Sequence, residues 1–518
     1  MLRHFAISRA FFVLAAVSLC LSGRVTNAQM GFETARSLGL EVAWRAHVQV
    51  PFNGKGLAST NFWVDSANQE QFAQVKLENR TFRVSANQLG RDGKAIGIEG
   101  AKKAVSIQAG KYLGKPTGFQ VDTVSVPKVY LVVVTGNGLV QNFDAETGKL
   151  LWSAPCGNTF EPAFPAALCK KGVAVIHGTN LYFFDWATGK QMKQVRARSR
   201  TSNAIAIAGG VGFASDYVGN VTSYALGTDS TPWSYVMNGR AVGQPVSFAD
   251  QQFCAIASDA GYAYVFTFEK TPKVWMRYET NSSISGSLAA GNNAIYVGTT
   301  GGTISKVTAE SRLGSIAWEY RASDPINRPA LVDGDNVFVS TETGNLISIK
   351  DSSAGVANWS VPAHVSSVLG VTSDRVYGVT FSNRIVAFDK ATGQRVATTA
   401  PFDFGHAIVN SSTNRIYIVT RDGRLECLRP IGSELPEFIV PVAPVDPAEK
   451  PATAAPAANP NAQPAGNIFG PAAPAAGGAD VFNADPFSGG AGDDPFSGGA
   501  GDDPFATGDG DPFGDGGL

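Results

Sequence analysis

The stretch NFDAETGKLLW, residues Asn142–Trp152, has the order of side chains expected for a tight β-hairpin. An apolar strand end leads to Asp144, whose carboxylate can accept hydrogen bonds from turn amides, and then to Thr147 and Gly148. Glycine supplies the backbone freedom that the chain reversal needs. The second strand ends on Trp152, and an indole buries about 150–250 Å². The motif therefore predicts a structural unit, with the tryptophan as its packing anchor.

The same pattern recurs along the chain at a nearly constant period. The residue before the second strand of each unit's central pair is glycine or asparagine, and neighbouring units are 39 to 42 residues apart. These markers are Gly138, Asn180, Gly219, Gly261, Gly302, Gly344, Asn383 and Gly423. Each unit contains about four short β-rich segments, which is typical of a β-propeller blade. The sequence predicts an all-β fold, an eight-bladed β-propeller with four-stranded antiparallel blades.

The last unit lacks an outer strand of its own. Five other units carry a tryptophan 14 to 16 residues after the marker, namely Trp152, Trp233, Trp275, Trp318 and Trp359. The missing strand has its counterpart near the N-terminus, where residues 40–48 form a β-rich stretch with Trp44 in the corresponding place. We predict that this strand completes the eighth blade and closes the ring, which protects the sheet edges.

Composition divides the chain into segments. Residues 1–28 read as a cleavable export signal, with a short apolar run and small residues before the cleavage site; Leu19 before Cys20 makes a poor lipobox. The propeller is predicted over 36–430, with an insertion at about 51–117 that contains a hairpin and a short helix carrying Ala101, Val105 and Leu113 on one side. Residues 431–518 form a Pro/Ala/Gly-rich tail predicted to be disordered. A periplasmic or secreted location follows, with no transmembrane segment in the mature chain.

Charge and cysteine content limit the possible functions. The formal net charge is -1 and no Lys/Arg cluster stands out, so nucleic acid is not expected as a partner. Cys156 and Cys169 flank one loop and could form a disulfide in an oxidising compartment. The alternative is that all four cysteines of the mature chain are small buried apolar side chains.

Three segments carry a family resemblance. DAETGKLLW from Asp144, DWATGKQMK from Asp185 and DKATGQRVA from Asp389 resemble the pyrroloquinoline-quinone (PQQ) repeat, which covers about residues 129–430. This family contains quinoprotein alcohol dehydrogenases and the non-catalytic outer-membrane assembly factor BamB, both eight-bladed propellers. The motif is specific for the fold rather than for function. The expected structural anchors are Trp44, Asp144, Gly148, Trp152, Asp185, Gly189, Trp233, Trp275, Trp318, Trp359, Asp389 and Gly393.

The resemblance implies what a catalytic member would need. The dehydrogenases hold calcium on the quinone with Glu, Asn and Asp, use an Asp base, and often carry a vicinal disulfide. This sequence has no adjacent cysteine pair, no recognisable acidic-Asn cluster and no Cys-x-x-Cys-His. We therefore predict no catalytic residues, no metal and no cofactor, with a divergent PQQ- and calcium-dependent oxidoreductase as the alternative.

Polar residues recur at the predicted start of each innermost strand, 16 to 19 residues before the marker. They are Glu161, Asn203, Gln244, Ser285, Arg328, His364 and His406. A polar ring at the channel mouth would suit a ligand or peptide. The alternative is that channel mouths are wet and therefore polar.

The tail repeats Asp-Pro-Phe, with its phenylalanines at Phe487, Phe496, Phe505 and Phe513. Two Gly-Gly-x-Gly-x-Asp units match a calcium-binding nonapeptide pattern, but prolines occupy positions where strand amides should donate. The repeats could also act as linear motifs that bind a partner by avidity, or as an acidic solubilising tail.

These observations favour an exported, non-catalytic, monomeric β-propeller that serves as a protein-binding or envelope-assembly scaffold. Propeller faces suit extended protein contacts, and sheet edges can accept a partner strand.

Overall fold

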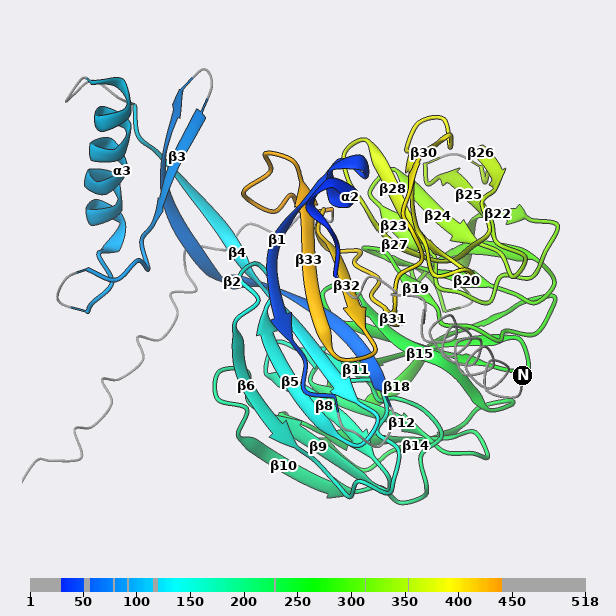
Figure 1. Cartoon of the computed structure of the whole chain (residues 1–518). Helices are drawn as coiled ribbons and strands as arrows, with labels where there is room; N and C mark the ends of the chain where they lie inside the picture. Colours follow the sequence, from blue (N-terminus) through cyan, green and yellow to red (C-terminus); the bar gives the residue numbers. More distant parts are fainter. Residues whose placement is uncertain are drawn as a thin grey trace, which may run out of the picture. The chain divides into compact units, whose positions relative to one another are not determined.

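A computed structural model describes residues 29–50, 56–77, 80–90, 93–114, 120–227, 230–312, 314–352 and 354–439. Within these ranges the chain forms eight antiparallel sheets around a central axis and two helices, α2 (Phe32–Ser37) and α3 (Gly97–Leu113) (Figure 1). The predicted eight-bladed β-propeller is confirmed. The proposed signal peptide and the Asp-Pro-Phe repeats lie outside the described residues.

From the innermost to the outermost strand, the first four blades are β2 (Leu57–Leu77), β4 (Asp122–Thr135), β5 (Leu139–Asp144) and β6 (Leu150–Pro155); β7 (Ala167–Cys169), β8 (Gly172–His177), β9 (Asn180–Phe184) and β10 (Gln191–Arg196); β11 (Ala206–Ala208), β12 (Val211–Ser215), β13 (Asn220–Ala225) and β14 (Ser234–Val236); and β15 (Ala241–Phe248), β16 (Phe253–Ser258), β17 (Tyr262–Phe268) and β18 (Pro272–Glu279).

The other four are β19 (Ala289–Ala290), β20 (Ala294–Gly298), β21 (Thr303–Thr308) and β22 (Ser315–Arg321); β23 (Leu331–Asp333), β24 (Asn336–Ser340), β25 (Asn345–Lys350) and β26 (Ala357–Pro362); β27 (Val365–Val371), β28 (Arg375–Thr380), β29 (Ile385–Asp389) and β30 (Arg395–Thr398); and β31 (Phe404–Ala407), β32 (Ile416–Thr420), β33 (Arg424–Pro430) and β1 (Leu40–His47).

The core lies between neighbouring blades. Val132 and Val134 of blade 1 pack on Val173 and Val175 of blade 2, and all four are fully buried. The middle strands of a blade have neighbours on both faces, so they are almost continuously apolar, whereas the outermost strands alternate with exposed residues. The ring is therefore stabilised mainly by burial of apolar surface between sheets.

The ring closes through the pairing of the two ends of the propeller. β1 runs antiparallel to β33, with Trp44 opposite Cys427. Arg45 Nε donates to Glu426 Oε1 at 3.0 Å, across 381 residues of sequence. The eighth blade thus contains three strands from the C-terminal end of the propeller and one from the N-terminal end.

The Asp-x-x-Thr-Gly motif of blades 1, 2 and 7 joins each of these blades to the preceding one. The Asp144 carboxylate accepts hydrogen bonds from the Glu146 and Thr147 amides, at 3.0 and 2.9 Å, and so holds the turn. Trp152 Nε1 of blade 1 donates to the Trp186 carbonyl oxygen of blade 2 at 2.7 Å. The same donation, to the residue after the turn aspartate or its equivalent, is made by Trp44, Trp275, Trp318 and Trp359.

The motif glycine makes room for that tryptophan. A Cβ at Gly148, Gly189 or Gly393 would lie 2.4, 2.5 or 2.6 Å from the indole of the preceding blade. Asp185 and Asp389 hold their turns as Asp144 does. Trp233 differs, because it packs edge-on against Phe213 and Phe266 within the third and fourth blades.

The insertion is placed differently from the prediction. Residues 57–64 of β2 already form the innermost strand of blade 1, and beyond an irregularity at Asp65–Gln69 the same strand continues into a small lobe (Figure 1). β3 (Arg80–Ser85) pairs there with β2, and α3 covers them through Ala101, Val105 and Ala109. The lobe is therefore inserted between two strands of one blade rather than before the blade. Leu113 does not share the buried side, since it is 45% exposed.

No disulfide forms among the described cysteines. Cys156, Cys169, Cys254 and Cys427 are all free and buried, which matches the alternative interpretation. Burial raises the pKa of the Cys156 thiol to about 12, so very little thiolate is present at neutral pH. These thiols are packing groups rather than nucleophiles.

Candidate functional site

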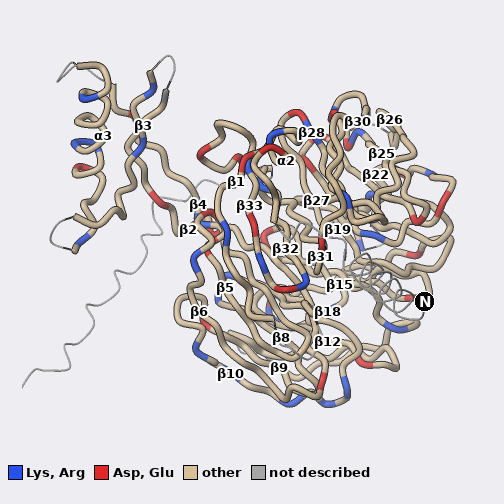
Figure 2. The backbone as a smooth tube through the Cα atoms, viewed as in Figure 1, with Lys and Arg blue, Asp and Glu red and all other residues tan. Residues whose placement is uncertain are grey.

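The innermost strands enclose a central cavity of about 430 Å³. Its walls come from seven of the eight blades, and no charged side chain lines it in the described part of the chain. The lining residues are Ala58, Ser59, Thr60, Asn61, Phe62, Trp63, Ala166, Ala167, Leu168, Ile205, Ala206, Gln244, Pro245, Val246, Ser247, Gln251, Ser287, Leu288, Ala289, Ala290, Pro329, Ala330, Val332, His406, Ala407, Val409, Ser411 and Ser412. Figure 2 shows charged residues mainly in connections and at strand ends.

Two of the seven predicted channel residues line this cavity. Gln244 lies in β15 and His406 in β31, on blades that stand opposite each other in the ring. Burial lowers the pKa of His406, because the charged imidazolium loses hydration there. The remaining five residues do not line the cavity.

Asn203 and Ser285 bind neighbouring blades instead. Asn203 Nδ2 donates to the Gly243 carbonyl oxygen at 2.6 Å, and Ser285 Oγ donates to Asn327 Oδ1 at 2.5 Å. Each bond connects one innermost strand region to that of the next blade. Polar residues at these positions are therefore used in joining the blades.

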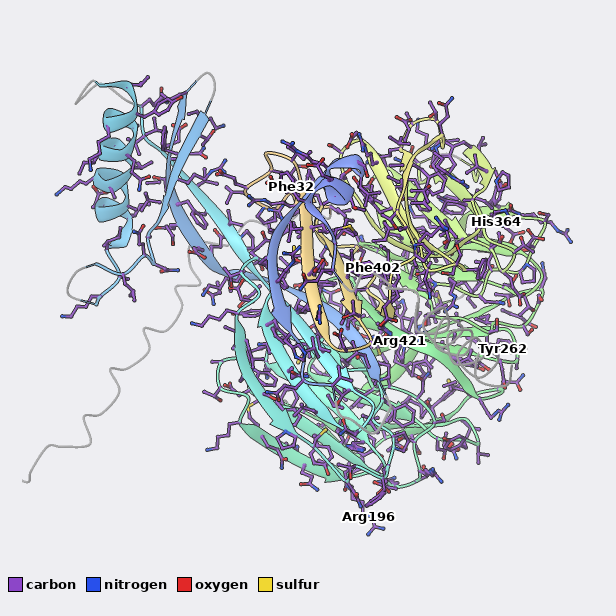
Figure 3. The ribbon with its side chains drawn as sticks, in the orientation of Figure 1. Phe32, Arg196, Tyr262, His364, Phe402 and Arg421 are labelled. Atoms are coloured by element: carbon purple, nitrogen blue, oxygen red, sulfur yellow. The ribbon has the colours of Figure 1, made fainter. Side chains whose placement is uncertain are left out.

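Glu161, Arg328 and His364 lie in connections that lead to innermost strands. Arg328 and His364 are exposed, and His364 has a φ of +53°. Figure 3 shows His364 away from the centre of the ring. The Glu161 carbonyl oxygen faces His177 Nε2 at 2.9 Å. The predicted ring is thus only partly assembled around the cavity.

The cavity does not fit the cofactor pair of the catalytic relatives. PQQ carries three carboxylates, and calcium is held by carboxylate, amide and carbonyl oxygens. The described residues of the walls include no cation to pair with the carboxylates of PQQ and no carboxylate to bind calcium. Elsewhere among the described residues, no group of three or more His, Cys, Asp and Glu side chains could hold a metal. We derive no quinone-dependent step.

A second surface, which sequence analysis missed, lies on the rim of blade 2. β10 is an outermost strand in which no residue is buried, and it continues into an exposed connection. Residues 191–200 contain Lys193, Arg196, Arg198 and Arg200 and no acidic residue. We call residues 191–200 the arginine strip. Two sequence signals could have revealed this strip. Arginine occurs at every second position from Arg196 to Arg200, and Lys193 stands where other outer strands have tryptophan.

Exposed apolar side chains border the arginine strip. Arg200 lies over the Tyr217 ring, with Cζ 5.9 Å from its centroid. Tyr217 and the adjacent Val218 are 50% and 75% exposed. Figure 3 shows Arg196 pointing outward from the edge of the molecule. Neither α2 nor α3 is long and apolar enough to cross a membrane.

Similarity to known proteins identifies the family to which the chain belongs. The family model described as outer membrane protein assembly factor BamB matches residues 104–271 and 264–373, which together exceed half of the chain. Among solved structures, BamB from Moraxella catarrhalis is 14% identical with a TM-score of 0.46, covering 58% of this chain and 93% of that one. The computationally designed Ika8 protein is 14% identical with a TM-score of 0.44, covering 57% and 92%. No curated protein matches.

The assignment rests on the family model together with the repeat and its eight blades. The chain belongs to the PQQ-repeat β-propeller family described by outer membrane protein assembly factor BamB.

Proposed function

We propose that this protein is an exported, non-catalytic scaffold of the cell envelope that holds a protein partner at the arginine strip. The family described as an assembly factor supports the class of function. The observation that carries the proposal is the exposed, wholly cationic edge of blade 2 beside exposed aromatic and aliphatic side chains.

The strand geometry suits an extended partner. β10 pairs on one side with β9 and is the last strand of its sheet, so its outer edge is open to a further strand. The Ala197 amide donates to the Thr179 carbonyl oxygen at 2.8 Å, and the chain bends at Arg198 and Ser199. A partner strand could pair with β10 itself, and Arg196, Arg198 and Arg200, at and beyond its end, would meet acidic residues at one end of that partner strand.

The arginines are not neutralised locally. The ion pairs found among the described residues include none of Arg196, Arg198 and Arg200. Asp216, at the turn between β12 and β13 of blade 3, accepts hydrogen bonds from Ser199 Oγ of the strip and from the Val218 and Asn220 amides rather than from an arginine of the strip. Three guanidinium groups therefore remain for bidentate binding of carboxylates.

Site-specific photo-cross-linking in the producing cells tests the proposal. A benzophenone amino acid at Met192 in β10, which is 47% exposed, is expected to give a discrete adduct with an envelope protein. The matched control is Val396 in β30, an outer strand that also lacks tryptophan, where it is 48% exposed. The triple substitution R196Q/R198Q/R200Q should abolish the Met192 adduct. Equal adducts from both positions, or an adduct that survives the triple substitution, would refute the site.

A further inference from the structure

The central cavity has two kinds of wall. Its polar lining comes from blades 8 and 1, with Thr60, Asn61, His406, Ser411 and Ser412 among the contributors, and from blades 4 and 5. In an eight-membered ring these two pairs of neighbouring blades face each other. The polar groups therefore lie at two opposite sides of the cavity.

The walls between those sides are apolar. Blades 2 and 3 contribute Ala166, Ala167, Leu168, Ile205 and Ala206, with no polar residue. The wall facing blade 2 belongs to blade 6 and consists of Pro329, Ala330 and Val332. A cavity with polar ends and apolar sides is complementary to a molecule that has an apolar middle and polar groups at its two ends.

Two polar side chains at the ends are available to a ligand. Within the described residues, the side chains of Gln244 and His406 make no hydrogen bond to protein, unlike Gln251 and Ser247, which bind the Leu168 and Ile207 carbonyl oxygens. A Gln amide both donates and accepts, and a neutral imidazole does the same through its two nitrogens. A ligand group that donates or one that accepts a hydrogen bond can therefore be bound at either end of the cavity.

The lining also disfavours a charged ligand. No Asp, Glu, Lys or Arg lines the cavity in the described part of the chain, so a buried ionic group would lose its hydration without a partner charge. The cavity volume of about 430 Å³ falls within the range of roughly 300–1,000 Å³ found for small-molecule pockets. We propose that the central cavity binds a small, uncharged molecule with hydrogen-bonding groups at two opposite ends.

This inference does not depend on the partner proposed for the arginine strip. It differs from the quinone site of the catalytic relatives in ligand charge, and no carboxylate that could hold a metal is among the described lining residues. The experiment uses two matched pairs of probes that differ in charge but little in size, 4-hydroxybenzamide with 4-hydroxybenzoate, and nicotinamide with nicotinate. Binding to the full-length protein is measured by calorimetry and by ligand-observed saturation-transfer NMR.

At least one neutral probe is expected to bind saturably, at one site per chain and at least tenfold more tightly than its carboxylate. Gln244→Leu and His406→Leu should each weaken that binding at least tenfold. His47→Leu is the matched control, because His47 is exposed on the outer strand of the same blade as His406. Gln244→Met, which has a similar side-chain length without the amide, serves if Gln244→Leu does not fold, and should give the same loss.

Three results would overturn the proposal. They are an absence of saturable binding by both neutral probes up to their solubility limits, carboxylates that bind as well as the neutral probes, and neutral-probe binding that is unchanged in both folded cavity variants. Circular dichroism of each variant establishes that the propeller is intact, so that loss of binding is not loss of fold.

Discussion

We predict that the repeat motif requires glycine because the tryptophan of the preceding blade leaves no room for a Cβ. Gly189 offers a test. Its φ is +67°, and an added Cβ would lie 2.5 Å from Cδ2 of Trp152. Gly189→Ala should therefore destabilise the protein in two separable ways, through the left-handed backbone and through the clash with the indole. The first cost is independent of Trp152, and the second requires it.

The two costs can be estimated separately. A non-glycine residue in the left-handed region costs about 1–2 kcal/mol, and overpacking a well-packed contact costs about 1–3 kcal/mol. Gly189→Ala should thus lower the free energy of unfolding by about 2–5 kcal/mol in the wild-type background. With Trp152→Ala present the clash disappears, so Gly189→Ala should cost only about 1–2 kcal/mol more, even though Trp152→Ala itself costs about 3–5 kcal/mol. The expected coupling is about 1–3 kcal/mol.

Guanidinium denaturation of the four proteins, followed by far-UV circular dichroism, measures this double-mutant cycle. Gly114→Ala is the matched control, because Gly114 has the same φ of +67° and no atom within 4 Å of the added Cβ. It should cost about 1–2 kcal/mol in both backgrounds. If Gly189→Ala costs the same with and without Trp152, the indole does not dictate the glycine and the explanation of the motif fails.

Three further predictions concern buried titratable groups. Arg415→Met leaves the Glu146 carboxylate without its partner at 3.1 Å and should cost about 3–5 kcal/mol at pH 7. Burial raises the pKa of Glu146, so the folded state binds the proton more readily and the loss should shrink at pH 5; equal losses in denaturation curves at the two pH values would contradict this. Burial lowers the pKa of His406, so wild type should lose more stability than His406→Gln as pH falls from 7.5 to 5.5, and parallel pH profiles of the unfolding midpoint would argue against it. The four described cysteines should resist Ellman's reagent in the native protein and react after denaturation, whereas rapid reaction of the native protein would refute their burial.

The blade count could be predicted because each blade repeats one local requirement, a glycine or asparagine at the turn between the second and third strands. The closing strand could be predicted because Trp44 repeats the outer-strand pattern. The lobe was misplaced because nothing in the sequence marks the point where β2, 21 residues long, leaves the blade at Asp65. Local patterns specify blades, but they do not specify where a strand passes from one packed unit to another.

The candidate sites were harder to predict. A fixed offset from the marker placed Gln244 and His406 on innermost strands, but it placed Glu161 six residues before β7 begins at Ala167. The distance from the marker back to the innermost strand varies with the length of each connection. The arginine strip was missed because the overall charge is nearly neutral, and net charge conceals a local run of one sign.

The pairing of β1 with β33 has a consequence for the order of folding. The partners of the closing strand lie about 380 residues later in the chain, as the Arg45–Glu426 pair shows. A contact of such high sequence separation pays a large loop-closure entropy and forms only after the intervening blades have shortened the effective loop. Until Arg424–Pro430 is available, β1 remains an open strand able to pair with other chains. The ring can therefore close only after the last repeat has folded. A chain that lacks this repeat would keep seven blades in an open ring, with β1 unpaired.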